Sequence, residues 1–144
     1  MDDEERARRS ADAMWAGDAA SRWLGMALAE VGPGRAVLTL TVVPHHCNGH
    51  GTCHGGVIFA LADSAFAFAC NSGNRATVAQ HATVSFVAPA KAGDRLRAEA
   101  REVSLRGRSG LYDVTVTDEG GGRVAEFRGM SRAVGGPLFK EDGA

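Results

Sequence analysis

The sequence lacks the features that mark a secreted, membrane-bound or nucleic-acid-binding protein. Its 16 Lys and Arg nearly balance 17 Asp and Glu, and no long basic block appears, which argues against general nucleic-acid binding. The N-terminal residues alternate acidic and basic clusters without the apolar core of a signal peptide. The longest apolar run, residues 57–70, is too short to span a bilayer and contains Asp63. We therefore expect a cytoplasmic protein that binds a small molecule or a protein, not nucleic acid or a membrane.

Cysteine is also scarce. Cys47, Cys53 and Cys70 are an odd number in a chain without a secretion signal, which favours reduced thiols over a disulfide framework. Residues 45–54 hold four His and two Cys, so a metal site is an alternative to consider. Their spacing does not match the paired Cys and His pattern of a structural zinc site, and we predict no metal.

The 144 residues suit a single domain of the α+β class. Apolar periodicity and Gly- or Pro-rich breaks predict helices at 4–16 and 55–71 and strands at 24–31, 35–43, 77–87, 95–105, 110–117 and 123–134. The second helix is apolar almost all round and must be buried. We expect it to lie in the concave face of a curved antiparallel sheet of five to six strands.

One carboxylate lies inside that apolar helix. An isolated ionised Asp63 is costly there unless it is hydrogen-bonded or its pKa is shifted. Such a residue usually has a chemical task, and the alternative is a structural acid bonded to a buried Ser, Tyr or Arg.

The helix begins with Gly55 and Gly56. Their backbone N–H groups have no intrahelical partner, so they suit a phosphate or the oxyanion of a tetrahedral intermediate, although a tight turn is an equally good use of the glycines. Asp63 follows Gly55 by eight positions, a rise of ~12 Å. One chain therefore cannot place both at one carbonyl group, whereas a twofold dimer with antiparallel helices would bring Gly55 opposite the second copy's Asp63.

Two polar residues precede the helix. His54 is predicted to orient a bound carbonyl or the loop, and the alternative is a hydrogen bond at the helix N-terminus without a ligand. Asn48 is either a turn residue beside Gly49 or an amide that holds a water or the Asp63 carboxylate.

The pattern Asn48-x-x-Gly51-Thr52-x-His54-Gly55-Gly56, with residues 61–67 and 70–72, resembles the hotdog-fold acyl-CoA thioesterases of the phenylacetic-acid-degradation (PaaI) type. Further matches are Val87-x-Pro89-Ala90-x-x-Gly93-Asp94 and Phe127-Arg128-Gly129-x-Ser131. The resemblance covers residues 23–136, the expected hotdog thioesterase domain. Residues 1–22 are then a charged helical extension, and 137–144 a flexible tail.

The resemblance implies hydrolysis of an aryl-acetyl or related aromatic acyl-CoA in phenylacetate catabolism, at the interface of a homodimer that pairs into a homotetramer. Asp63 would be nucleophile or general base, the Gly55 N–H would polarise the carbonyl, and His54 and Asn48 would position water and thioester. No cofactor is implied, because coenzyme A is part of the substrate. A hydroxyl that animal relatives carry on the next strand falls near Ala79, so Thr77 or Gln80 would have to replace it.

Coenzyme A phosphates need cations or N–H donors at the mouth of the site. The candidates are Gly56 and the turn Arg106-Gly107-Arg108, with Lys91 and Arg132; each arginine has a solvated surface role as its alternative. Two rival functions remain: an acyl-CoA-binding hotdog protein without turnover, and a hotdog dehydratase.

Overall fold

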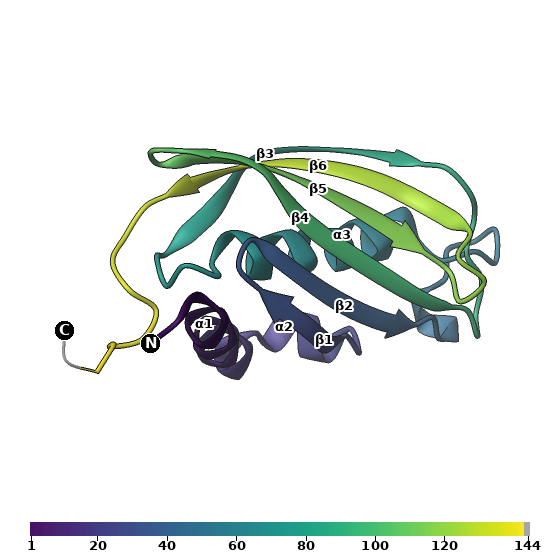
Figure 1. Cartoon of the computed structure of the whole chain (residues 1–144). Helices are drawn as coiled ribbons and strands as arrows, with labels where there is room; N and C mark the ends of the chain where they lie inside the picture. Colours follow the sequence, from purple (N-terminus) through teal and green to yellow (C-terminus); the bar gives the residue numbers. More distant parts are fainter. Residues whose placement is uncertain (143–144) are drawn as a thin grey trace.

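The computed structural model describes residues 1–142. Its elements in chain order are α1 (Asp3–Gly17), α2 (Ala19–Trp23), β1 (Ala27–Gly32), β2 (Arg35–Thr41), the 3-10 helix η1 (Pro44–His46), α3 (Gly55–Cys70), β3 (Thr77–Phe86), β4 (Arg95–Arg106), β5 (Ser109–Thr117) and β6 (Arg123–Ala133). The strands form one six-stranded sheet in the order β1-β2-β4-β5-β6-β3, and every neighbouring pair is antiparallel. The sheet curves around α3 (Figure 1). The predicted α+β arrangement is confirmed.

The side of α3 that faces the sheet is buried. Phe66 is fully buried, and its ring centroid lies 5.6 Å from that of Tyr112 and 5.7 Å from that of Phe127. Gly129 of β6 makes this approach possible, because a Cβ atom there would lie 2.8 Å from two atoms of the Phe66 ring. The helix therefore lies directly against β6 at a point where the strand has no side chain.

The opposite side of α3 is only partly buried, whereas the sequence predicted that the helix would be buried on all sides. Gly56, Ala60, Asp63, Ala67 and Cys70 follow one another at intervals of three or four residues and share one face of the helix. Gly56 is exposed and the other four are half-buried. A face of mostly small residues, with the Asp63 carboxylate at its centre, is thus left partly uncovered in the single chain.

Strand β3 is also partly uncovered. It is ten residues long and lies at the end of the sheet, where it pairs with β6 along one edge only. Val78 and Phe86 on this strand are 49% and 54% exposed. A long unpaired edge is a template for pairing with another strand.

The N-terminal extension contains two helices instead of one. Helix α1 agrees with the predicted 4–16, and it buries Ala7 and Ala11. The prediction of a strand from Leu24 was wrong at its start. Asp18 accepts a hydrogen bond from the Ser21 N–H (3.0 Å) and caps α2, and Gly25, at φ +89°, ends that helix before β1 begins.

The segment predicted as a flexible tail makes defined contacts in the part that the structure describes. Asn74, at φ 60°, accepts hydrogen bonds from the N–H groups of Leu138 (2.8 Å) and Phe139 (3.1 Å). Glu141 pairs with Arg6 of α1 at 3.0 Å. Residues 138–142 thus fasten α1 to the α3–β3 loop, while Gly143 and Ala144 lie outside the described residues.

Candidate active site

The start of α3 presents a free backbone donor. His54 is the N-cap, and its Nδ1 atom accepts the Gly56 N–H at 2.8 Å. The Gly55 N–H has no hydrogen-bond acceptor within residues 1–142. Gly55 borders a hollow of about 360 Å³ with Thr52 and Phe86. The first N–H of the helix is therefore without an acceptor beside this hollow, and His54 adopts the N-terminal hydrogen bond that was the alternative to carbonyl binding.

Phe86 explains why residue 55 is a glycine. A Cβ atom at Gly55 would lie 3.1 Å from Cζ of the Phe86 ring, closer than most real Cβ contacts. Any side chain at position 55 would push against this ring and narrow the hollow. The absence of a side chain at position 55 lets the helix start lie close to Phe86, a contact that the sequence did not predict.

Asp63 lies in a second hollow, of about 270 Å³, between α2 and α3, which it shares with Ser21 and Ser64. The Ser21 and Ser64 hydroxyls are 2.8 Å apart, and Ser21 donates to Asp18 at 2.7 Å. The Asp63 carboxylate has no hydrogen bond or ion pair to any described residue. Burial raises the pKa of Asp63 above its usual value. A half-buried acid without a partner is available for chemistry, unlike the structural acid that was the alternative.

One chain does not bring the two groups together. Gly55 and Asp63 border different hollows, and eight helical residues separate them by ~12 Å along the axis. Within one chain the two groups therefore lie apart, and a site completed by two copies of α3 stays a prediction.

Asn48 shapes the loop before α3. Its Oδ1 atom accepts hydrogen bonds from the N–H groups of His50 (2.9 Å) and Thr52 (3.3 Å) and from the Thr52 hydroxyl (3.3 Å). The structure therefore shows the turn role for this oxygen. Only the Nδ2 group remains for a water or a ligand.

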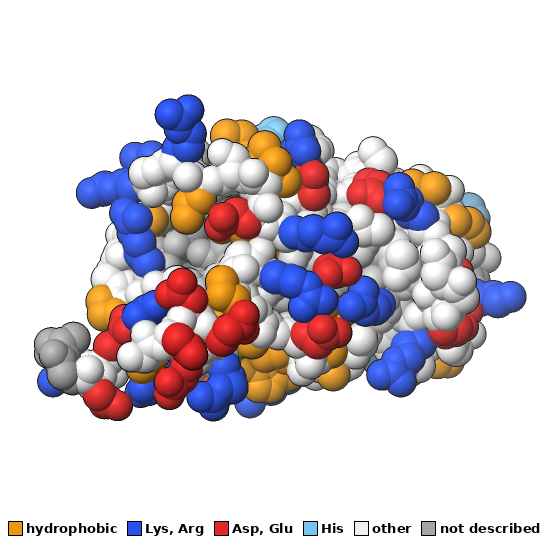
Figure 2. Space-filling view, viewed as in Figure 1, with side chains coloured by type: hydrophobic (Ala, Val, Ile, Leu, Met, Phe, Trp, Pro, Cys, Tyr) orange, Lys and Arg blue, Asp and Glu red, His pale blue; other side chains and the backbone are white. Residues whose placement is uncertain are grey.

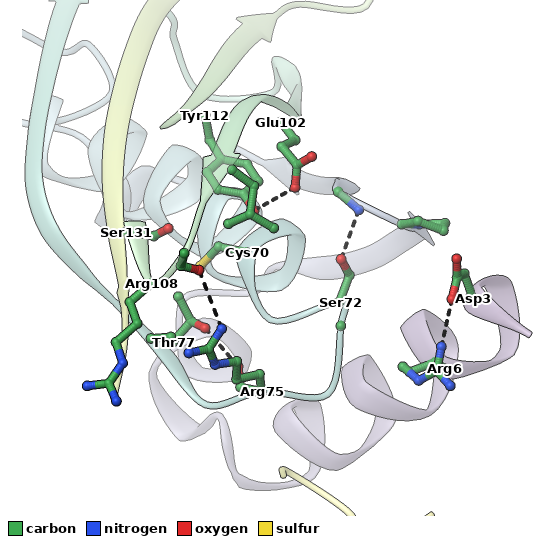
Figure 3. Close-up of a pocket in the computed structure, with 16 residues that line it drawn as sticks. Asp3, Arg6, Cys70, Ser72, Arg75, Thr77, Glu102, Arg108, Tyr112 and Ser131 are labelled. Carbon is green, nitrogen blue, oxygen red and sulfur yellow. Dashed lines mark hydrogen bonds and ion pairs between the residues drawn. The ribbon is translucent and has the colours of Figure 1, made fainter. Parts of the chain in front are cut away.

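A third hollow, of about 490 Å³, lies at the C-terminal end of α3 (Figure 3). Gly107 and Arg108 of the predicted phosphate-binding turn border it, together with Cys70. Arg75 points toward the same turn and donates to the Gly107 carbonyl at 3.4 Å. Arg75 was missed by the sequence analysis, because it is a single cation in a loop without a motif. Arg106 is the last residue of β4, beside this turn.

Figure 2 shows Lys and Arg side chains gathered over the end of the molecule that carries the β4–β5 turn. Elsewhere on the sheet, cations alternate with acids: Glu99 lies within 3.3 Å of Arg35, Arg97 and Arg101. Arg132 donates to Ser109 at 3.3 Å, close to the basic end. The basic side chains near the turn are therefore distinct from this ion-paired face.

Lys91 does not join this group within one chain. It lies beside Ala90, whose carbonyl accepts the Cys53 N–H just before α3, whereas Arg108 borders the hollow at the other end of that helix.

Thr77 and Gln80, the two residues predicted to replace the missing hydroxyl, lie in different surroundings. Thr77 borders the same hollow as Arg108 and donates to the Arg75 carbonyl at 2.8 Å, while Gln80 lies at an irregularity in the pairing of β3 with β6.

The histidines of residues 45–54 do not converge on one point. His46 is buried; its Nδ1 accepts the Val43 N–H (3.1 Å), and its Nε2 faces the Leu24 carbonyl (2.8 Å). Within residues 1–142, no group of three or more His, Cys, Asp or Glu side chains is arranged to hold a metal ion.

Among the described helices, none combines the length and apolar character that crossing a bilayer requires.

Residues 50–125 match the model of the thioesterase superfamily. Over 136 residues the chain is 41% identical to the acyl-coenzyme A thioesterase PaaI of Escherichia coli (strain K12), covering 94% of this chain and 97% of that protein. The chain therefore belongs to the thioesterase superfamily. The predicted resemblance is confirmed, and it extends beyond residues 23–136 into the N-terminal extension.

Solved structures agree. The E. coli PaaI protein from the phenylacetic acid degradation operon matches with a TM-score of 0.92 at 41% identity, over 93% of this chain and 97% of that one. The TT0310 protein of Thermus thermophilus matches with a TM-score of 0.76 at 40% identity, over 79% and 96%. A Streptococcus mutans protein bound to acetyl CoA matches with a TM-score of 0.76 at 26% identity, over 78% and 91%. The hotdog fold predicted from the sequence is confirmed.

Proposed function

We propose that this protein is an acyl-CoA thioesterase that hydrolyses aryl-acetyl or related aromatic acyl-CoA in phenylacetate catabolism. The observation that carries the proposal is the pair of unpartnered groups on α3, the Gly55 N–H and the half-buried Asp63 carboxylate. The E. coli relative is named an acyl-coenzyme A thioesterase, and its solved structure is that of a protein from the phenylacetic acid degradation operon. Both support the proposed substrate class.

A homodimer would complete the site. The open edge of β3 and the half-buried face of α3 formed by Gly56, Ala60, Asp63, Ala67 and Cys70 are both surfaces that a second copy of the chain would cover. If β3 pairs with β3 of the second copy and the two α3 helices lie antiparallel, two equivalent sites result, each with Gly55 from one chain and Asp63 from the other. Assembly of two such dimers into a tetramer stays a prediction of the resemblance.

In this site the thioester carbonyl oxygen accepts the Gly55 N–H, at the end of α3 where the helix dipole is positive. The ionised Asp63 then either attacks the carbonyl carbon or removes a proton from the attacking water. The carbon–sulfur bond breaks, and water supplies the hydroxyl of the acid and the proton of the coenzyme A thiol. We propose that Asn48 and His54 hold the loop that flanks the carbonyl, and that the reaction needs no metal or other cofactor.

The nucleotide end of coenzyme A would lie against the basic end of the molecule. Arg75, Gly107 and Arg108 border one hollow, with Arg106 beside it. Arginine binds phosphate through several N–H donors at once. The Gly56 N–H, which the sequence also predicted to bind substrate, already donates to His54 Nδ1 at 2.8 Å and is not a free donor. The acetyl CoA bound to the S. mutans relative supports coenzyme A recognition by this fold. The three free cysteines are in keeping with the cytoplasm as the compartment.

A thiol-release assay over matched aryl and alkyl acyl-CoA thioesters tests the proposal, with Asp63→Asn as the control for contaminating hydrolases. We expect release of free coenzyme A with the highest kcat/KM on aryl-acetyl thioesters, and loss of release in the variant. Binding without release would indicate the acyl-CoA-binding rival, and formation of an enoyl product without thiol release would indicate a dehydratase.

A further inference from the structure

Two of the cysteines face each other across a short antiparallel bridge. Cys47 and Cys53 are directly opposite in this bridge, which closes the loop 48–52. The hydrogen bonds that hold the bridge lie on either side of the pair, from the Asn48 N–H to the Thr52 carbonyl and from the His54 N–H to the His46 carbonyl, both 2.8 Å. The cysteines themselves are therefore a non-hydrogen-bonded pair.

The backbone N–H groups of the two cysteines point away from each other, as this pairing requires. The Cys47 N–H donates to the Pro44 carbonyl at 3.0 Å, and the Cys53 N–H donates to the Ala90 carbonyl at 2.7 Å. Opposite residues in a non-hydrogen-bonded pair have Cα atoms ~4.5 Å apart and side chains on the same face. A disulfide spans Cα separations of roughly 4.4–6.8 Å, so the backbone already has the spacing that the bond needs.

The two thiols differ in access. Cys53 is 5% exposed, and burial, with a contribution from the neighbouring Cys47 thiol, raises its pKa to about 11. Cys47 is half-buried and reaches solvent more readily. Thiol–disulfide exchange begins with a thiolate that an outside disulfide can reach. Cys47 is thus the first residue to react and Cys53 the second.

We propose that Cys47 and Cys53 form a reversible disulfide that closes the loop 48–52 in front of α3. The oxidant is a small-molecule disulfide, RSSR. The Cys47 thiolate attacks one sulfur and releases RS⁻; the Cys53 thiolate then attacks the mixed disulfide at the Cys47 sulfur and releases the second RS⁻. In total two cysteine thiols are oxidised to one disulfide, and RSSR is reduced to two RSH.

The bond would tie the loop that contains Asn48 to the residue just before the N-cap of α3. Because the cysteines are already opposite each other in the backbone bridge, the cross-link needs no change of backbone pairing. It needs only that the Cys47 and Cys53 thiols turn from the Val43 and His54 carbonyls, each 3.8 Å away, toward each other. It limits the conformations of the unfolded chain and of the loop, so the oxidised protein should melt at a higher temperature. This inference does not depend on the proposed reaction, since it concerns the covalent state of the loop.

The experiment exposes the native protein to glutathione buffers of graded redox potential, without denaturant, and measures intact mass, disulfide-linked peptides and Tm. We expect a fall of about 2 Da per chain, a peptide that links residues 47 and 53, a rise in Tm of about 5 °C, and reversal by dithiothreitol. The Cys70→Ser variant is the matched control and should behave as wild type. Cys70 lies at the other end of α3.

The Cys53→Ser variant should instead trap glutathione on Cys47 as a stable mixed disulfide, because the second thiol is missing. Cys47→Ser should take up none at position 53, where the sulfur is buried. The proposal is overturned if wild type shows only a glutathione adduct, if its mass falls by about 2 Da only in denaturant, or if the linked peptide contains Cys70. Because the wild-type peptide map decides these outcomes, the test holds even if a variant folds poorly.

Discussion

A mixed dimer of two inactive variants should regain thioesterase activity. The first variant, Asp63→Asn, keeps an intact helix start but loses the carboxylate. The second, Gly55→Val, keeps Asp63 but fills the hollow at the helix start, where even a Cβ atom would lie 3.1 Å from the Phe86 ring. If each site combines Gly55 of one chain with Asp63 of the other, the mixed dimer has one complete site and one that lacks both groups.

The expected recovery follows from counting sites. Each mixed dimer should have about half of the wild-type activity, and equal amounts of two randomly exchanging chains give mixed dimers as about half of the population. The mixture should therefore reach about a quarter of wild-type kcat per chain. Mixing Asp63→Asn with wild type should give about half, which equals simple dilution.

Subunit exchange is achieved by mild denaturant followed by dialysis, or by co-expression with two different tags, and coenzyme A release is measured before and after. Circular dichroism and size-exclusion chromatography show whether Gly55→Val is folded and dimeric, and Gly55→Ala provides a milder block of the same hollow. If folded, exchanged mixtures stay inactive, each site is built within one chain, and the argument from the ~12 Å helix rise is wrong.

Asp63→Asn should lower kcat at least about a hundredfold with little change in substrate binding, as thiol release and calorimetric titration would show. Burial raises the pKa of Asp63, so the acid limb of the pH–kcat profile should lie above the usual Asp range, and a limb near pH 4 would contradict this. The same raised pKa means that the folded state holds this proton more tightly than the unfolded state, so wild-type stability should fall as pH rises above about 4 relative to Asp63→Asn, measured as Tm against pH. Changing Arg106 and Arg108 together to Ala should raise KM for acyl-CoA with little loss of kcat, and the effect should shrink at high salt and vanish for a thioester without the nucleotide; an equal rise for that truncated thioester would assign the pair to the fold. Changing Cys47 and Cys53 together to Ser should preserve most activity under reducing conditions, and prolonged chelation should have no effect; stoichiometric zinc lost together with activity would contradict this.

Much of the fold could be predicted because local signals agree with the packing. Each of three local patterns predicted the element that the structure contains: the apolar run predicted α3, the alternation predicted β5, and the glycine-rich breaks predicted turns. Helix α2 was missed because its signal is short. Asp18 alone caps its five residues by accepting the Ser21 N–H, and the Leu24 to Val31 stretch that follows has the composition of a strand. A single capping residue is a weaker predictor than an apolar run, so the helix start at Asp18 becomes clear only from the hydrogen bonds of the structure.

The candidate site was predictable in its residues and less so in their contacts. Gly55 and Asp63 were both identified, and their separation along the helix follows from geometry alone. The sequence could not choose between the roles of Asn48, because an Asn beside Gly suits both a turn and a ligand. It also could not find Arg75, whose place beside Gly107 depends on how the α3–β3 loop meets the β4–β5 turn.

Position 129 must stay a glycine when selection changes the acyl preference of the protein. A methyl group there would meet the Phe66 ring at 2.8 Å and would lift α3 from β6, and Asp63 lies only three residues before Phe66 on the same helix. Displacement of a catalytic group by ~1 Å can cost a hundredfold in rate, so libraries that vary position 129 should be mostly inactive. Ala60 and Ala67 border the hollow of Asp63 on the outer face of α3, and both are half-buried, whereas Gly129 is buried. New acyl selectivity is therefore most accessible to evolution on the outer face of this helix, while its inner contact with the glycine stays fixed.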